Sequence, residues 1–170
     1  MNYGAVLGLY YAGKFPLFLV SFKSGMAGLL FIALTLMVPA VAYMLTKRFR
    51  LTYPGDATLS FARIWSFTLQ LFFYASIIAA AVHYIYFSFF DHGAVATTLN
   101  ESLVQMQQTA IEGVTDTASW QGQVESMKQA VETLSSMTPV QITMQLFGNN
   151  LFWGCIAAFP VAILNSHRTS

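Results

Sequence analysis

The stretch Gly28-Leu29-Leu30-Phe31-Ile32-Ala33-Leu34-Thr35-Leu36-Met37-Val38 decides the fold, because it is long, apolar and free of charge. It forms the centre of an apolar run over residues 25–45. A helix needs about 20 mostly apolar residues to cross the hydrocarbon core of a bilayer. The run therefore predicts a transmembrane helix.

Three further runs meet the same criterion, over residues 3–22, 61–90 and 140–164. The first contains Lys14 and Pro16, but no basic leader precedes it, so we interpret it as a retained helix and not as a cleaved signal peptide. The run over residues 61–90 is the longest, and a helix of that length should tilt or protrude from the bilayer. The sequence thus predicts an all-α polytopic membrane protein with four transmembrane helices, forming one membrane domain over residues 1–170.

The composition of the whole chain agrees with this fold class. Of its 170 residues, 56 % are hydrophobic and 9 % are Asp, Glu, Lys or Arg, and the net charge is +1. A soluble domain carries about 25 % charged residues. The low charge excludes intrinsic disorder and a nucleic-acid-binding arm, and the single cysteine, Cys155, excludes a disulfide scaffold.

The basic residues are sorted along the chain and predict an orientation. Lys47, Arg48 and Arg50 lie between the second and third runs, and Arg63 lies just inside the third. Short loops that are rich in Lys and Arg stay in the cytoplasm. We therefore expect this connection to be cytoplasmic and, with four spans, both termini to lie on the same side.

Residues 91–139 form an acidic segment of a different kind, with six Asp or Glu residues against Lys128 alone. Two apolar series run through the segment with helical spacing. The first consists of Leu99, Leu103, Met106, Ala110 and Val114. The second consists of Trp120, Val124, Met127, Val131 and Leu134. Gly113 and the sequence Thr115-Asp116-Thr117 separate them, so we expect an extramembrane helical hairpin between the third and fourth transmembrane helices.

The second apolar series of this segment is a candidate partner surface, and we call it the partner stripe below. An amphipathic helix pair can cover such a stripe by packing on itself, by lying on the bilayer or by docking a partner. Binding to the membrane surface is disfavoured, because such helices are usually basic. Self-packing and partner docking, including assembly with a second copy of the chain, both remain open.

The start of the last transmembrane helix has its own signal in Thr138-Pro139-Val140-Gln141. Threonine caps a helix, proline suits its first turn, and a Gln three residues after the cap can bind the amide of the capping residue. We therefore expect this helix to start at Thr138.

Polar side chains lie near the middle of each predicted span, counted at about 1.5 Å per residue from the helix ends. They are Lys14, Thr35, Gln70, Asn149 and Asn150. A polar group at this depth needs a partner, so we expect these side chains to turn inward and meet in one layer. Three interpretations remain open: hydrogen bonds that hold the helices together, a small cavity in which Lys14 binds a ligand or ion, or a Lys14 side chain that reaches to the interface.

Enzymatic chemistry has little support in the sequence. His83, His92 and His167 are isolated, and no pair of His or Cys residues has metal-ligand spacing. A glycine-rich phosphate loop is also missing. We interpret His83 as a packed histidine in the third helix, and we expect no cofactor, no metal and no enzymatic activity.

Several stretches of the chain resemble a known family. They are Tyr84-Ile85-Tyr86-Phe87-Ser88-Phe89-Phe90-Asp91-His92-Gly93, the junction Phe49-Arg50 before a Gly-containing turn and Ser60-Phe61, and Thr138-Pro139-Val140-Gln141 leading to Asn149-Asn150 and Gly154. The chain is similar in these stretches to the Bacteroidota domain-of-unknown-function family 4199. The resemblance covers essentially the whole chain, and it implies four transmembrane helices in a bacterial inner membrane with no established activity.

These observations predict a multi-pass inner-membrane protein that acts as a non-enzymatic interaction or accessory subunit. The alternative is a small transport or ligand-binding unit built around the polar layer. We expect the lipid bilayer as surroundings, a protein partner or a second copy at the periplasmic helices, and no nucleic acid.

Overall fold

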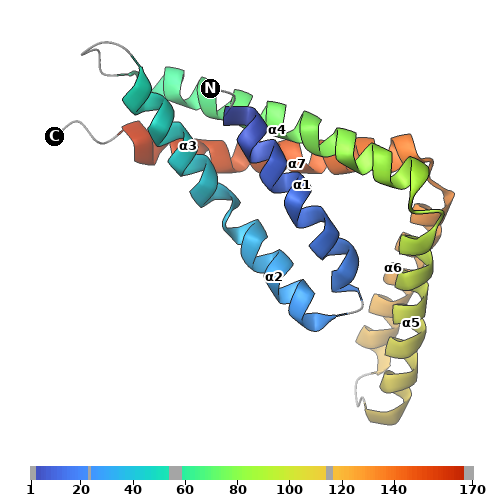
Figure 1. Ribbon diagram of the computed structural model, residues 1–170. Coiled ribbons are helices and arrows are strands. Elements are labelled where there is room, and N and C mark those ends of the chain that lie inside the picture. Colours follow the sequence, from blue (N-terminus) through green and yellow to red (C-terminus); the bar gives the residue numbers. More distant parts are fainter. Residues whose placement is uncertain (1–2, 23, 54–58, 114–116, 167–170) are drawn as a thin grey trace. The chain divides into compact units, whose positions relative to one another are not determined.

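The computed structural model describes residues 3–22, 24–53, 59–113 and 117–166, and every regular element in these ranges is a helix (Figure 1). The helices in chain order are α1 (Tyr3–Ser21), α2 (Gly25–Leu36), α3 (Val38–Thr52), α4 (Phe61–Phe89), α5 (Ala94–Gly113), α6 (Thr117–Ser136) and α7 (Pro139–Ser166). The all-α prediction is therefore confirmed for the described residues.

Four helical stretches are long and apolar enough to cross a membrane: α1, α2 with α3, α4 and α7. They contain 19, 28, 29 and 28 residues. Their positions agree with the four predicted spans. The second span continues to Thr52, beyond the predicted end at residue 45, because the basic turn that follows the apolar run is also helical.

The second span is not a single regular helix, which differs from our expectation. A turn at Met37 separates α2 from α3, and Pro39 stands in the first turn of α3. Proline has no amide hydrogen and its ring collides with the carbonyl four residues earlier. The carbonyl of Thr35 therefore loses its helical donor, and the helix breaks at this point.

The chain divides into two compact units. Unit 1 contains Met1–His83 and Met144–Ser170, and unit 2 contains Tyr84–Thr143. The four membrane-length stretches meet in unit 1, and α5 and α6 belong to unit 2.

In unit 1, α1 packs closely on α4 through two glycines. A Cβ atom at Gly4 would lie 2.7 Å from Cβ of Tyr74, and one at Gly8 would lie 2.7 Å from Cβ of Ile78. Small residues at such positions let two helix backbones approach each other. Since Gly4 lies on Tyr74 and Gly8 on Ile78, the two helices run in the same direction.

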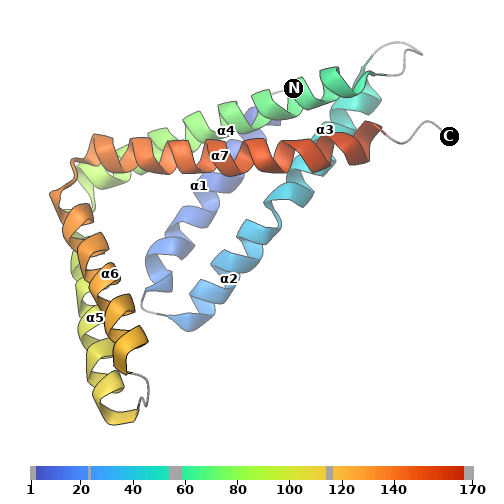
Figure 2. The ribbon, with the colours of Figure 1, turned by 180° about the vertical axis from the view of Figure 1, so that it is seen from behind.

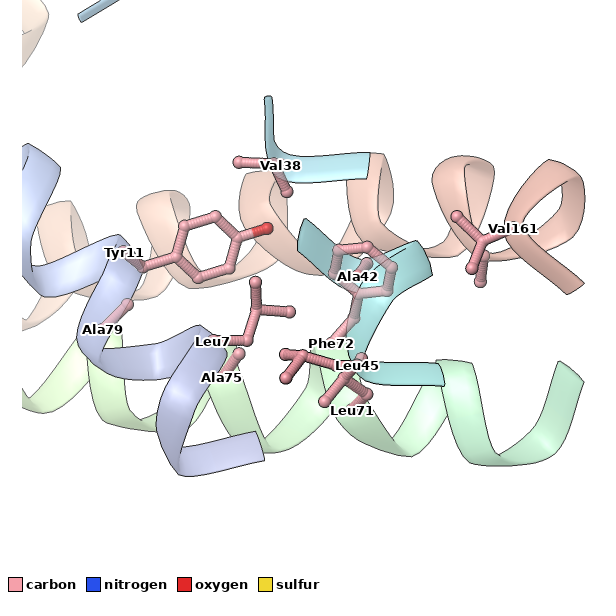
Figure 3. Packing of buried hydrophobic residues seen from close by; sticks show 11 residues of the cluster. Leu7, Tyr11, Val38, Ala42, Leu45, Leu71, Phe72, Ala75, Ala79 and Val161 are labelled. Atoms are coloured by element: carbon pink, nitrogen blue, oxygen red, sulfur yellow. The ribbon is translucent and has the colours of Figure 1, made fainter. Parts of the chain in front are cut away.

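Helix α7 lies along α4 in the opposite direction (Figure 2). Gly154 makes this approach possible, because a Cβ atom there would lie 2.8 Å from Cβ of Phe72. The apolar core lies between α1, α3, α4 and α7, and Figure 3 shows its side chains meeting there. Its members include Leu7, Tyr11, Val38, Ala42, Leu45, Leu71, Phe72, Ala75, Ala79, Ala158 and Val161.

Several helix ends gather at one end of unit 1. The hydroxyl groups of Tyr3 and Thr52 are 3.4 Å apart, which places the start of α1 beside the end of α3. The guanidinium of Arg50 donates a hydrogen bond to the main-chain carbonyl of Asn165 in the last turn of α7. The first residues of α1 and the last residues of α7 therefore lie at the same end of unit 1 as Arg50.

In unit 2, α5 and α6 pack against each other (Figure 1). Helix α5 ends at Gly113 and α6 begins at Thr117, as the break in the apolar pattern predicted. Asp91 caps α5, because its carboxylate accepts hydrogen bonds from the amides of Gly93 and Val95, both at 3.1 Å.

The predicted capping box at the start of α7 is also present in unit 2. The amide of Thr138 donates to Oε1 of Gln141 at 2.8 Å, and the amide of Gln141 donates to Oγ1 of Thr138 at 3.3 Å. The two bonds fix the first turn of the helix reciprocally. The predicted helix start, with Thr138 as the capping residue before Pro139, is confirmed.

Candidate intramembrane polar site

Lys14 lies between α1 and α2 and is the charged centre of the candidate site. Its Nζ donates a hydrogen bond to Oγ1 of Thr35 at 3.3 Å. The same nitrogen lies over the rings of Tyr11 and Phe31, at 4.9 and 5.4 Å from their centroids. The negative faces of aromatic rings attract a cation. The side chain is half-buried, and these three neighbours surround its ammonium group.

The break between α2 and α3 lies directly beside this lysine. The hydroxyl of Tyr10 donates a 2.7 Å hydrogen bond to the carbonyl of Leu34. Leu34 and Thr35 are the two residues before Leu36, the last residue of α2, and Pro39 interrupts the helical hydrogen-bond series there. Tyr10 and Lys14, which are four residues apart on α1, thus both bind polar groups at the break.

His83 packs near this site from α4. Its ring lies 4.4 Å from the ring of Phe15, centroid to centroid, with the planes tilted by 51°. The side chain is buried, and its Nδ1 has no hydrogen-bond partner among the described residues. The expected packing of His83 is thus present, but its contact is an aromatic ring.

The described part of unit 1, residues 3–22, 24–53, 59–83 and 144–166, contains no Asp or Glu. Lys14 therefore has no carboxylate partner within that part of the chain. Its hydrogen bond to Thr35 uses one of the three donors that an ammonium group carries. The arrangement holds the ammonium group of Lys14 itself and can bind an anionic group, but the described residues of unit 1 offer it no carboxylate.

Gln70 lies far from Lys14 along the helices. Gly8 on α1 contacts Ile78 on α4, and from this contact Lys14 lies six residues further along α1 while Gln70 lies eight residues back along α4. The two residues are thus about 20 Å apart along the helix axes. The side chain of Gln70 is exposed on the outside of α4.

The two amides of α7 lie on different sides of the helix. The face of α7 that contacts α4 is set by Gly154. Asn149 is exposed and lies five residues, or about 500° of helical rotation, before Gly154, so it is turned away from the contact. Asn150 is half-buried and lies four residues, or about 400°, before Gly154, on the side that faces α4. The structure therefore joins Lys14 and Thr35, and it places Gln70 and Asn149 on the outside of their helices.

The partner stripe lies on α6 and is partly covered in unit 2. Val124, Val131 and Leu134 are half-buried, and Met127 is exposed at 36 %. Trp120 belongs to α6, but its side chain lies outside the described residues. Helix α5 packs against α6 and has its own buried positions, Val95 and Leu103.

Two features that position the site had signals in the sequence that we did not use. Gly4 and Gly8 are spaced by four, which is the pattern of close helix packing in membranes. Pro39 lies inside the second apolar run, and a proline there predicts a break.

The described residues contain no group of three or more His, Cys, Asp or Glu side chains that could hold a metal ion.

The comparisons with known proteins agree with the resemblance seen in the sequence. The family described as "Protein of unknown function (DUF4199)" matches residues 2–166. No curated protein and no solved structure matches the chain. Because the match covers nearly the whole chain, the protein belongs to the DUF4199 family.

Proposed function

We propose that this protein is a non-enzymatic interaction or accessory subunit of a bacterial inner membrane. The basic end of unit 1, with Lys47, Arg48 and Arg63, faces the cytoplasm together with both termini. The acidic α5–α6 pair then lies in the periplasm, because one span, α4, separates it from the basic connection. This orientation rests on charge, and the gathering of helix ends beside Arg50 supports it.

One observation carries the proposal: the polar side chains of the expected layer do not all converge. Lys14 is held by Thr35 and two rings between α1 and α2, whereas Gln70 and Asn149 are exposed on the outside of α4 and α7. Catalysis and transport need polar groups that converge on one substrate. Polar groups that face outward in a bilayer instead serve contacts with other helices.

A photo-crosslinking experiment tests the proposal in native membranes. A benzophenone amino acid replaces Ile77, which is 43 % exposed and lies seven residues after Gln70 on the same side of α4. A second variant carries it at Leu29 of α2, which is 65 % exposed, as a matched site without polar neighbours on its helix. We expect protein adducts at Ile77 and lipid adducts at Leu29. Lipid adducts alone at both sites contradict the proposal.

The alternative, a small ligand-binding or transport unit, is favoured by one observation at Lys14. Two of the three donors of its ammonium group are not used by the hydrogen bond to Thr35. A small anion could take them from the side where Lys14 is exposed. Anion-dependent protection of the purified protein against thermal unfolding, lost in Lys14→Met and kept in Lys128→Met, would support this alternative.

A further inference from the structure

The outward face of α7 carries amide side chains and a glycine. Gln145 and Asn149 are exposed, and a Cβ atom added to Gly148 would meet nothing within 4 Å. Phe152 and Ile156 continue the same side and are 61 % and 49 % exposed. We call these five residues the α7 face. Their spacings of three and four residues place them on one side of the helix.

The α7 face lies opposite the side of α7 that packs in unit 1. Gly154 contacts Phe72, and Ala158, Val161 and Ala162 are buried. These buried positions share one side by the same three-and-four spacing. The amides of the α7 face are thus not oriented toward the core of unit 1.

The length of α7 places Asn149 within the hydrocarbon wherever the helix sits in the bilayer. Helix α7 has 28 residues, and the hydrocarbon core takes about 20 of them. Every 20-residue segment of Pro139–Ser166 includes residues 147–158. Gly148, Asn149, Phe152 and Ile156 therefore all lie at hydrocarbon depth, with Gln145 nearer to its periplasmic edge.

An exposed amide at this depth faces lipid tails that offer neither donor nor acceptor. Leaving it unsatisfied there is costly, and Asn side chains in membranes usually bind across helix–helix contacts. Gly148, one residue before Asn149, leaves room for a second helix backbone to come close. The two observations together indicate that a protein helix covers the α7 face.

We propose that the occupant is the α7 face of a second copy of this chain, in a dimer with a two-fold axis along the membrane normal. Two copies insert in the same orientation, so their α7 helices run parallel and Asn149 of each copy lies at the same depth. An amide has both donor and acceptor atoms, so two identical amides satisfy each other. A different partner would need its own polar residue at this depth. The proposal rests on the membrane location proposed above.

Disulfide crosslinking in native membranes tests the dimer. In a Cys155→Ser background, one variant carries Ile156→Cys on the α7 face, and the control carries Leu36→Cys on α2. Leu36 is more exposed than Ile156, at 76 % against 49 %, and also lies at hydrocarbon depth in every placement of the second span. Random collision would therefore favour the control. We expect a disulfide-linked dimer several-fold stronger with Ile156→Cys than with Leu36→Cys.

A second substitution asks whether the amide holds the dimer. Adding Asn149→Leu to the Ile156→Cys variant should reduce the dimer band several-fold, whereas Asn149→Gln should retain it. Equal dimer bands for Ile156→Cys and Leu36→Cys, or an unchanged band with Asn149→Leu, would overturn the inference. Size-exclusion profiles of each purified variant show that it is folded.

The outcome also separates this inference from the proposed function. A benzophenone adduct to another protein at Ile77, without dimer at Ile156→Cys, leaves the interaction subunit in place and removes the second copy. A disulfide-linked dimer of Ile156→Cys without protein adducts at Ile77 supports the contact between two α7 faces. It leaves the proposal that exposed polar residues of α4 contact another protein without support.

Discussion

Lys14 shows how a charged residue is accommodated within an apolar helix. Placing a lysine at the centre of a membrane helix costs about 2.5–3.5 kcal/mol. A hydrogen bond across helices offsets about 0.6 kcal/mol, and each cation–π contact contributes on the order of 1 kcal/mol. The contacts with Thr35, Tyr11 and Phe31 therefore nearly balance the cost. The helix can therefore accommodate Lys14 at little cost in folding free energy, but these contacts give no net stabilisation that would explain why a lysine stands here.

A double-mutant cycle of Lys14→Met and Thr35→Val tests this balance. We expect Lys14→Met to change the free energy of unfolding by no more than about 1 kcal/mol, since the lost contacts and the removed charge oppose each other. The coupling between the two substitutions should be about 0.6 kcal/mol. Unfolding by titration with a denaturing detergent, followed by circular dichroism, measures both. A coupling near zero would show that the hydrogen bond has no energetic role.

At the residue scale, the sequence predicted one contact of the polar layer and not the rest. Lys14 and Thr35 were expected to meet, and their side chains are in contact. Gln70 and Asn149 were expected to turn inward, and they are exposed. Counting residues gives a position along one helix, but the level of two helices relative to each other and the direction of a side chain depend on which sides of the helices pack. Those sides were set by glycine contacts whose partners are far apart in the sequence.

At the element scale, α1 depends on its two glycines. Gly8 leaves no room for a side chain, because an added Cβ would lie 2.7 Å from Cβ and 2.9 Å from Cδ1 of Ile78. Gly8→Ala should therefore lower the free energy of unfolding by about 1–3 kcal/mol. Gly13→Ala on the same helix is the matched control, because a Cβ there meets nothing within 4 Å.

The control should behave in the opposite way. Alanine favours a helix over glycine by up to about 1 kcal/mol, so Gly13→Ala should leave stability unchanged or raise it. Thermal unfolding of the two purified variants in the same detergent makes the comparison. Equal destabilisation by both substitutions would mean that α1 does not pack closely on α4.

The capping box at the start of α7 gives a prediction for unit 2. Thr138→Ala removes the hydroxyl that accepts the amide of Gln141, and should destabilise the first turn by about 1 kcal/mol. Amide hydrogen exchange of Gln141 should accelerate accordingly. Thr133→Ala is the control, because its hydroxyl bonds within α6 to the carbonyl of Gln129. If both variants exchange alike at Gln141, the cap has no stabilising role.

Elements with a local signal could be predicted closely from the sequence. The capping residues fixed the start of α7 at Thr138, and Gly113 marked the end of α5. The break at Met37 was not predicted, although Pro39 is a signal for it in the sequence. The prediction used the length of the apolar run, and a run can be long enough whether or not its helix is continuous. Length and hydropathy locate spans, whereas proline and glycine determine their shape.

For the molecule as a whole, charge is distributed by position. Unit 1 has its exposed cations, Lys47, Arg48 and Arg63, at the end where the first residues of α1 and the last of α7 also lie. The described acidic residues, in contrast, all belong to unit 2. The clustering of Lys and Arg at this end of unit 1 is what the positive-inside rule requires of a protein whose basic end is cytoplasmic. The orientation in the membrane is therefore the claim on which the interaction proposals depend.

Site-directed labelling measures that orientation directly. In a Cys155→Ser background, single cysteines replace Gln129 on α6 and Arg48 on α3, both of which are exposed. Cells with a permeabilised outer membrane are treated with a membrane-impermeant maleimide, before and after the inner membrane is opened. We predict that Gln129→Cys reacts at once and that Arg48→Cys reacts only after opening. Immediate reaction of Arg48→Cys, or protection of Gln129→Cys until the inner membrane is opened, would contradict the account.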